Sequence, residues 1–155
     1  MILTENARLR LRTMCRDDLE ELYALLSDAE VMRWLEPPFT REQAERFLQQ
    51  AGLSEPPLVY AAESSEGEFL GYAIYHGYDE RSCELGWVLK PAFWHKGYAD
   101  EMTDLLTALA RRAGKDAVIE CVPEQTASAQ IARRHCFSYE GRADGCDVYR
   151  LRCKE

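Results

Sequence analysis

The stretch that decides the fold runs from Cys83 to Asp104 and reads CELGWVLKPAFWHKGYADEMTD. Its first part, Glu84 to Leu89, is rich in apolar, aromatic and β-branched residues, which predicts a strand. Pro91 lacks the N–H that a ladder needs, so the strand should stop at Lys90. From residue 102 to residue 113 apolar side chains recur at the spacing of an amphipathic helix. The stretch therefore predicts a strand, a short turn and a long helix.

The turn between this strand and this helix has the features of an anion site. The first turn of a helix carries unpaired backbone N–H groups and the positive end of the helix dipole. Gly97 lets the backbone approach an anion, Ala99 keeps the helix start narrow, and Lys96 adds a cation. A diphosphate would fit here, although a short glycine turn is also found in ordinary strand-to-helix connections.

The wider turn, Trp94-His95-Lys96-Gly97-Tyr98-Ala99, resembles the acetyl-CoA binding segment of the GNAT superfamily of N-acetyltransferases, whose pattern is Gln/Arg-x-x-Gly-x-Gly/Ala. Trp94 departs from the pattern at its first position, and this substitution is typical of the ribosomal-protein (RimJ/RimL-like) branch. His95 stands where that branch usually has glycine, so a glycine-only backbone conformation would be strained there. The resemblance implies that acetyl-CoA is the cofactor and that its diphosphate contacts Trp94, His95, Lys96, Gly97, Tyr98 and Ala99.

Length and composition are those of one domain, residues 1–155. The chain is 46% hydrophobic, which is enough for a core. No run approaches about 18 apolar residues, and the first residues lack a basic segment followed by an apolar one. We therefore expect no membrane partner and a cytoplasmic location. The six cysteines form no Cys-x-x-Cys pair and have no histidine spaced for zinc, so we expect neither a metal nor disulfides.

The net charge of −8 is unevenly distributed along the chain. Residues 1–82 hold 8 Lys and Arg against 16 Asp and Glu, whereas residues 83–155 hold 11 of each kind. An acidic protein is a poor binder of nucleic acid, so we expect no nucleic-acid partner. The acidic first half favours a cationic partner, or it simply keeps the protein in solution.

The rest of the chain shows helix and strand patterns in a definite order. Thr40 and Gln43 form a capping box that starts the second helix, and Gly52 ends it. The patterns predict a strand at 8–12, helices at 17–28 and 41–51, strands at 58–63, 69–78 and 84–90, a helix at 98–113, a strand at 117–122, a helix at 128–134 and strands at 137–142 and 148–152. This α+β (mixed α/β) order, β-αα-βββ-α-β-α-ββ, matches the GNAT fold over nearly the whole chain.

The resemblance also implies where the rest of the cofactor lies. The strand at 84–90 and the strand at 117–122 should splay apart, with the pantetheine arm bound between them along Trp87, Val88 and Leu89. The segment that usually reads Glu-Asn-x-x-Ser is Glu124-Gln125-Thr126-Ala127-Ser128 here. Gln125 would contact the arm and Ser128 would lie near the sulfur. The cations expected near the adenosine phosphates are Lys96, Arg133 and Arg134.

The implied chemistry is direct attack of a neutral amine on the thioester in a ternary complex. Glu84 is the expected base, acting through a water, and its structural alternative is a half-exposed glutamate in an ion pair. Ala132 lies where many relatives have a tyrosine that protonates the leaving thiolate, so Ser128 is the expected acid. Cys136 replaces the usual glycine before Phe137.

The acceptor pocket is expected to include Trp34, Phe39 and Tyr75, although aromatic residues such as Tyr75 are more often part of a core. The acceptor that the resemblance implies is the N-terminal α-amine of a protein or peptide. Two alternatives stay open at this point, a small cationic amine such as a polyamine or aminoglycoside and a non-catalytic acetyl-CoA sensor. The protein is expected to be a monomer or a homodimer.

Overall fold

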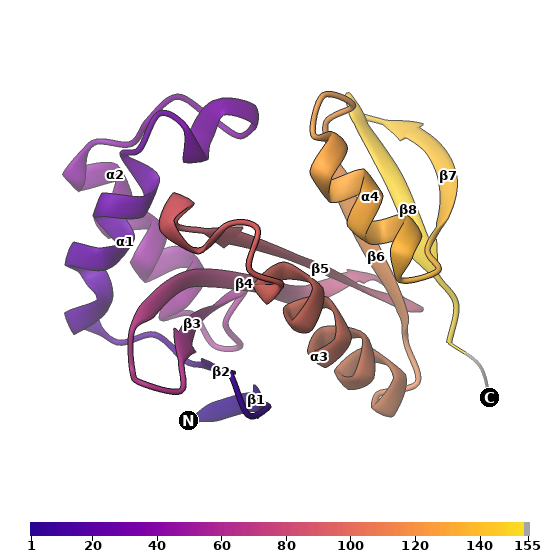
Figure 1. Cartoon of the computed structure of the whole chain (residues 1–155), viewed down its shortest axis with the longest axis horizontal. Helices are drawn as coiled ribbons and strands as arrows, with labels where there is room; N and C mark the ends of the chain where they lie inside the picture. Colours follow the sequence, from indigo (N-terminus) through magenta and orange to yellow (C-terminus); the bar gives the residue numbers. More distant parts are fainter. Residues whose placement is uncertain (154–155) are drawn as a thin grey trace.

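The computed structural model describes residues 1–153, which form one eight-stranded sheet with helices on both faces (Figure 1). The strand order is β1-β2-β3-β4-β5-β6-β8-β7. Every neighbouring pair is antiparallel except β5 and β6, which are parallel. The strands are β1 (Ile2–Glu5), β2 (Leu9–Arg12), β3 (Val59–Ser64), β4 (Phe69–Asp79), β5 (Ser82–Leu89), β6 (Asp116–Cys121), β7 (Ser138–Ala143) and β8 (Cys146–Leu151).

Four α-helices join these strands. They are α1 (Leu19–Leu26), α2 (Arg41–Phe47), α3 (Tyr98–Arg112) and α4 (Thr126–Arg134). Short helical turns precede α1 at Arg16–Asp18, lie between α1 and α2 at Val31–Trp34, continue α2 at Leu48–Gly52 and follow β5 at Pro91–Phe93. Among residues 1–153 we find no helix with the length and apolar character that a membrane span requires.

The predicted GNAT-type order of elements is confirmed, and most boundaries agree within two residues. Thr40 and Gln43 make the predicted capping box, with the Thr40 N–H donating to the Gln43 side chain at 2.8 Å and the Gln43 N–H to the Thr40 hydroxyl at 3.2 Å. Strand β1 was not predicted. It forms because the Asn6 side chain accepts hydrogen bonds from the N–H groups of Arg8 and Leu9, a turn that folds residues 2–5 back on β2.

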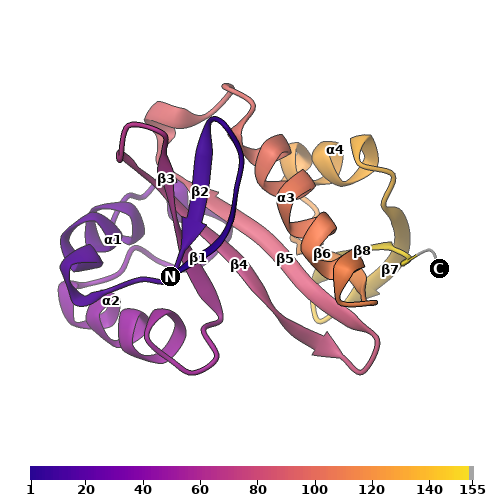
Figure 2. The ribbon, with the colours of Figure 1, turned by 90° about the horizontal axis from the view of Figure 1, so that it is seen from below.

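The two faces of the sheet carry separate apolar clusters, because successive residues of a strand point to opposite faces. In β3, Tyr60 and Ala62 join the cluster under α3, whereas Val59 and Ala61 join the cluster under α1 and α2. Figure 2 shows α1 and α2 on one side of the sheet and α3 on the other. The face of a strand residue therefore decides which half of the site its side chain can reach.

Helix α3 is held on its face by fully buried side chains. Met102, Leu106 and Ala110 recur at helical spacing and are 0 to 1% exposed. Burying an aliphatic side chain of this size contributes about 1.5–3 kcal/mol to the free energy of unfolding. The packing fixes the start of α3 beside the end of β5, which positions the turn between them.

A charged cluster joins the start of α1 to the sheet. The Arg12 guanidinium donates two 2.9 Å hydrogen bonds to the carboxylate of Asp18 and one of 2.9 Å to Glu63. Asp18 is 6% exposed. Burial alone would raise its pKa, but hydrogen bonds from Arg12 and from the Cys15 N–H outweigh burial and lower the pKa from its ordinary value of 3.8. The cluster thus stabilises the protein while Asp18 is ionised.

We predict that Asp18→Asn lowers the free energy of unfolding by about 2 kcal/mol, because Arg12 loses a buried charged partner. The folded-state pKa of Asp18 lies below its unfolded value, so this contribution is present above about pH 4 and is lost as the pH falls through the folded pKa. Urea unfolding from pH 3 to 7 measures the difference. Asp17→Asn, in the exposed neighbouring position, is the control and should change little. A pH-independent deficit in Asp18→Asn would contradict the role of the charge.

Candidate functional site

Strands β5 and β6 part soon after they begin, and this forms the fork of the site. They pair only at Ser82 with Asp116, Cys83 with Ala117 and Glu84 with Val118. Beyond these pairs β5 continues on β4 to Leu89, and β6 continues on β8. Figure 1 shows the two strands diverging, with β6, β7, β8 and α4 turned away from β5. The expected splay is therefore present.

The register of β4 and β5 sets which backbone groups face the fork. The Lys90 N–H donates to the Leu70 carbonyl at 2.9 Å, so by the alternation of an antiparallel ladder residues 86 and 88 also bond to β4. The backbone groups of Trp87 and Leu89 consequently point toward the parted β6. The indole N–H of Trp94 donates to the Leu89 carbonyl at 2.9 Å. Trp87 and the Leu89 N–H therefore offer backbone hydrogen bonds to a ligand in the fork.

Val88, which the sequence grouped with Trp87 and Leu89, faces elsewhere. Its backbone pairs with Tyr72, and its side chain is 8% exposed in the cluster under α1 and α2. The side chains of Trp87 and Leu89 pack with the cluster under α3 instead. Val88 is thus separated from Trp87 and Leu89, because successive side chains of β5 point to opposite faces of the sheet.

The turn before α3 is built from left-handed residues. His95 has φ +62° and Gly97, which caps α3, has φ +84°. Histidine in the left-handed region costs about 1 kcal/mol, so glycine would be the less strained residue there. Cys136 has φ +69° just after α4, which explains why glycine is usual at that position as well. Tyr98 and Ala99 begin α3 and pack against the sheet.

Of the three predicted cations, only Arg134 forms an ion pair among residues 1–153. Arg134 donates to the Asp100 carboxylate at 3.0 Å, and His135 lies 2.9 Å from the same group. The guanidinium of Arg133 lies 5.8 Å from the ring centroid of Tyr149. Lys96 is exposed, and within residues 1–153 its ammonium forms no ion pair. Arg134 therefore neutralises Asp100 in the first turn of α3, and His135 contacts the same carboxylate, an arrangement that the sequence did not predict.

The loop after β6 turns one predicted contact inward. The Gln125 side-chain oxygen accepts a hydrogen bond from the Val122 N–H at 3.1 Å, so Gln125 shapes the loop before α4. Ser128 is half-buried on α4, and within residues 1–153 its hydroxyl has no hydrogen-bond partner. Ala132 is 0% exposed in the core, where a tyrosine side chain would not fit without rearrangement. Of these residues, Ser128 retains a hydroxyl that a ligand could use.

Glu84 lies at the vertex of the fork, as the last residue of β5 that pairs with β6. Its carboxylate is 3.9 Å from Nε2 of His76, its partner on β4. The His76 Nδ1 is 2.9 Å from the Gly77 carbonyl, which only accepts, so Nδ1 carries the proton. The Tyr78 hydroxyl donates to Glu120 at 2.6 Å, and the Glu120 charge acts on Glu84. These neighbours come from β4 and β6.

This surrounding changes the acidity of Glu84. Burial raises the pKa of Glu84 above its ordinary value of 4.5, His76 opposes the rise, and the Glu120 carboxylate adds to it. The hydrogen bond to Glu120 raises the pKa of Tyr78 to about 12. A partly buried carboxylate with a raised pKa has the properties of a general base near neutral pH.

The three predicted acceptor residues have different surroundings. Phe39 packs edge-on against Phe47 at 6.2 Å in the cluster under α1 and α2. Tyr75 is paired with Leu85 on the α3 face and is half-buried beside Cys83, on the face opposite to that of Glu84. Trp34 is 37% exposed, and the Arg33 guanidinium covers its ring at 4.6 Å. Trp34 alone is left on the surface of the connector between α1 and α2.

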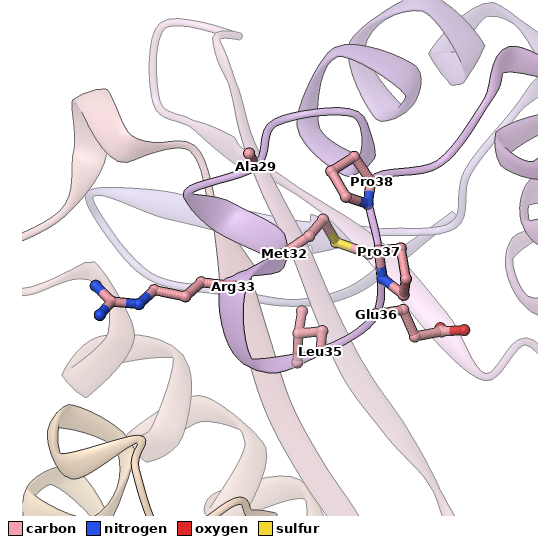
Figure 3. Close-up of a pocket in the computed structure, with 7 residues that line it drawn as sticks. All are labelled: Ala29, Met32, Arg33, Leu35, Glu36, Pro37 and Pro38. Carbon is pink, nitrogen blue, oxygen red and sulfur yellow. The ribbon is translucent and has the colours of Figure 1, made fainter.

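This connector has a hollow of about 390 Å³. Figure 3 shows its seven lining residues, with Arg33 and Glu36 extending to opposite sides and Pro37 and Pro38 following Glu36 in the connector. The lining residues are Ala29, Met32, Arg33, Leu35, Glu36, Pro37 and Pro38. The hollow is shallow and mixed in polarity, so it provides a surface and not an enclosed pocket. Within residues 1–153 no cluster of three potential metal ligands is present.

Comparison with known proteins identifies the family. Residues 8–138 match the family model described as the acetyltransferase (GNAT) domain. This match covers most of the chain, so the protein belongs to the GNAT acetyltransferases. It is an acetyl-CoA-dependent acyltransferase, and the expected fold and cofactor are confirmed. The family match thus favours an enzyme over the non-catalytic acetyl-CoA sensor.

Individual relatives agree with this assignment. The chain is 25% identical over 143 residues to the uncharacterized N-acetyltransferase YnaD of Bacillus subtilis (strain 168), covering 90% of this chain and 84% of the relative. A GNAT-family acetyltransferase from Bacillus anthracis superposes with a TM-score of 0.83 at 24% identity, covering 97% and 96% of the two chains. RimL, a ribosomal L7/L12 alpha-N-protein acetyltransferase in complex with coenzyme A, has a TM-score of 0.84 at 19% identity, covering 99% and 98%. The last two similarities show the fold.

Proposed function

We propose that this enzyme transfers the acetyl group of acetyl-CoA to a primary amine, and that its preferred acceptor is the N-terminal α-amine of a protein or peptide. The observation that carries the proposal is the position of Glu84, a carboxylate with a raised pKa at the vertex of the fork. The fork supplies backbone groups at Trp87 and Leu89, and the left-handed turn at Gly97 supplies helix N–H groups for a diphosphate.

In this proposal the residues of the chain position the reactants and move one proton. The acceptor nitrogen bonds to the acetyl carbon, the carbon–sulfur bond breaks, and the nitrogen loses a proton. Glu84 accepts that proton through a water. The Ser128 hydroxyl donates a hydrogen bond to the departing sulfur. A thiol with a pKa of about 8.5 needs little more help to leave.

The acidity of the acceptor favours an α-amine over a lysine side chain. An α-amine with a pKa of about 8 is roughly a tenth neutral at pH 7, whereas a lysine amine with a pKa of about 10.4 is neutral in less than about 0.1% of molecules. A single carboxylate base is sufficient to deprotonate an α-amine. RimL, which shares this fold, is a ribosomal L7/L12 alpha-N-protein acetyltransferase, so its acceptor amine is of this kind.

A small cationic amine is the second candidate acceptor, and Glu120 favours it. Glu84 and Glu120 act on one another across the fork, and both would attract a positively charged acceptor. The acidic first half of the chain acts in the same direction. The two acceptors differ in their dependence on salt, because an exposed charge is screened within about 10 Å at 0.1 M salt.

We predict that Gly97→Val weakens binding of coenzyme A by about tenfold or more. A β-branched residue at φ +84° costs about 1–3 kcal/mol, so the turn would change conformation and misplace its N–H groups. Gly67→Val is the matched control, since Gly67 has the same φ but nothing lies within 4 Å of an added Cβ. Calorimetry should give weaker binding in Gly97→Val only. Equal affinity in the two variants would show that the diphosphate binds elsewhere.

We predict that Glu84→Gln lowers kcat by about 100-fold, because the amide keeps the shape of the side chain but cannot accept a proton. Coenzyme A affinity should barely change. With an N-terminal peptide as acceptor, the wild-type rate should rise from pH 6 and level near about pH 8, where the amine becomes neutral. The raised pKa of Glu84 moves its own ionisation toward this range.

The control for this variant is Glu80→Gln, which removes a charge from an exposed turn. Its pH profile should match that of the wild type. Turnover by Glu84→Gln equal to the wild type across the range would remove Glu84 from the mechanism.

We predict that the two candidate acceptors can be distinguished by the salt dependence of their Michaelis constants. With an N-terminal peptide, the Michaelis constant should stay nearly constant between 0.05 and 0.5 M salt, whereas a cationic acceptor such as spermidine should show a Michaelis constant that rises by about threefold or more. Initial rates with both amines at saturating acetyl-CoA give the comparison. Faster turnover of spermidine at low salt would make the polyamine the better acceptor.

A further inference from the structure

The loop between β1 and β2, residues 6–8, reaches the first turn of α3. Asn6 donates to the Glu101 carboxylate at 3.0 Å across 95 residues of sequence, and the Arg8 guanidinium pairs with the other oxygen of Glu101. A second nitrogen of Arg8 donates to the Lys96 carbonyl at 3.0 Å. Figure 2 shows this loop beside the start of α3. The N-terminal hairpin is thus tied to the turn before α3.

Arg8 also lies over the turn before α3, next to Gly97. Its guanidinium lies 4.3 Å from the ring centroid of Tyr98, and a Cβ at Gly97 would lie 3.5 Å from its Nη1. The Asn6 side chain accepts from the Arg8 N–H at 2.8 Å and holds the loop in place. Arg8 therefore contacts Lys96, Tyr98 and Glu101 at once, on both sides of Gly97.

The first turn of α3 carries negative charge that would repel a bound anion, and Arg8 compensates part of this charge. It carries two carboxylates, Asp100 and Glu101. Carboxylates there favour the helix, but they oppose a second anion at the same N–H groups. Asp100 is neutralised by Arg134 at 3.0 Å. Glu101 depends on Arg8, since Asn6 supplies a hydrogen bond but no charge.

We infer that Arg8 is a positioning residue for the cofactor, which neutralises Glu101 and holds the Lys96–Gly97 turn so that the turn accepts a diphosphate. The inference rests on the proposed position of the diphosphate and is independent of the acceptor amine. A purely structural role for Arg8, which would only fasten the hairpin to α3, makes a different prediction. In that case removing the Glu101 charge would not restore binding.

The test measures coenzyme A affinity by calorimetry in four variants. Arg8→Ala should weaken binding about fivefold or more, since it leaves the Glu101 charge uncompensated. Glu101→Gln alone should bind as well as the wild type or more tightly. The double variant Arg8→Ala with Glu101→Gln should recover to within about twofold of Glu101→Gln, because neither charge is then present. Arg10→Ala, from the same hairpin, should not change the affinity.

The outcomes separate this inference from the proposed site. Weak binding in the double variant, equal to that of Arg8→Ala, would overturn the inference and leave Arg8 as a fastening of the hairpin. Unchanged affinity in Arg8→Ala, with weakened affinity in Gly97→Val, would also overturn it while the site stands. If Arg8→Ala does not fold, Arg8→Lys retains the charge and should bind within about threefold of the wild type. Loss of binding in a folded Arg8→Lys to the level of Gly97→Val would contradict the role of the charge.

Discussion

The parting of β5 from β6 after three residue pairs is the constraint on which the site depends. A strand that leaves its neighbour exposes backbone groups that need partners, and a ligand with amides of its own can supply them. The ladder with β4 decides that these groups belong to Trp87 and Leu89. It also sets Glu84 at the vertex. One change of register would remove both features at once.

The start of α3 is the second fixed point, and it is held by charge from two distant parts of the chain. Arg134 comes from the end of α4, and Arg8 comes from the first hairpin. With Asp100 and Glu101 neutralised, the backbone N–H groups at the start of α3 can bind an anion. A protein with a net charge of −8 can in this way bind a polyanionic cofactor. The overall charge is acidic, but the local charge at the turn is balanced.

The sequence predicted the features that arise from neighbouring residues. The alternation of strands, the capping box at Thr40 and the glycine turn at Gly97 are local, so they could be predicted without the fold. Val88 and Tyr75 point away from the expected sites because the direction of a strand residue depends on register. The contacts of Arg8, and those of Glu120 with Tyr78, join residues 42 to 93 positions apart. No local pattern contains that information.

We expect acetyl-CoA to lie along β5 and to end at the turn before α3. Amide hydrogen exchange, measured with and without coenzyme A, tests it most directly because it reports on individual backbone N–H groups. We expect slower exchange on binding at Trp87, at Leu89 and in residues 96–100. The connector between α1 and α2 should remain unchanged. Slower exchange confined to that connector, with none in β5 or at the turn, would contradict the account.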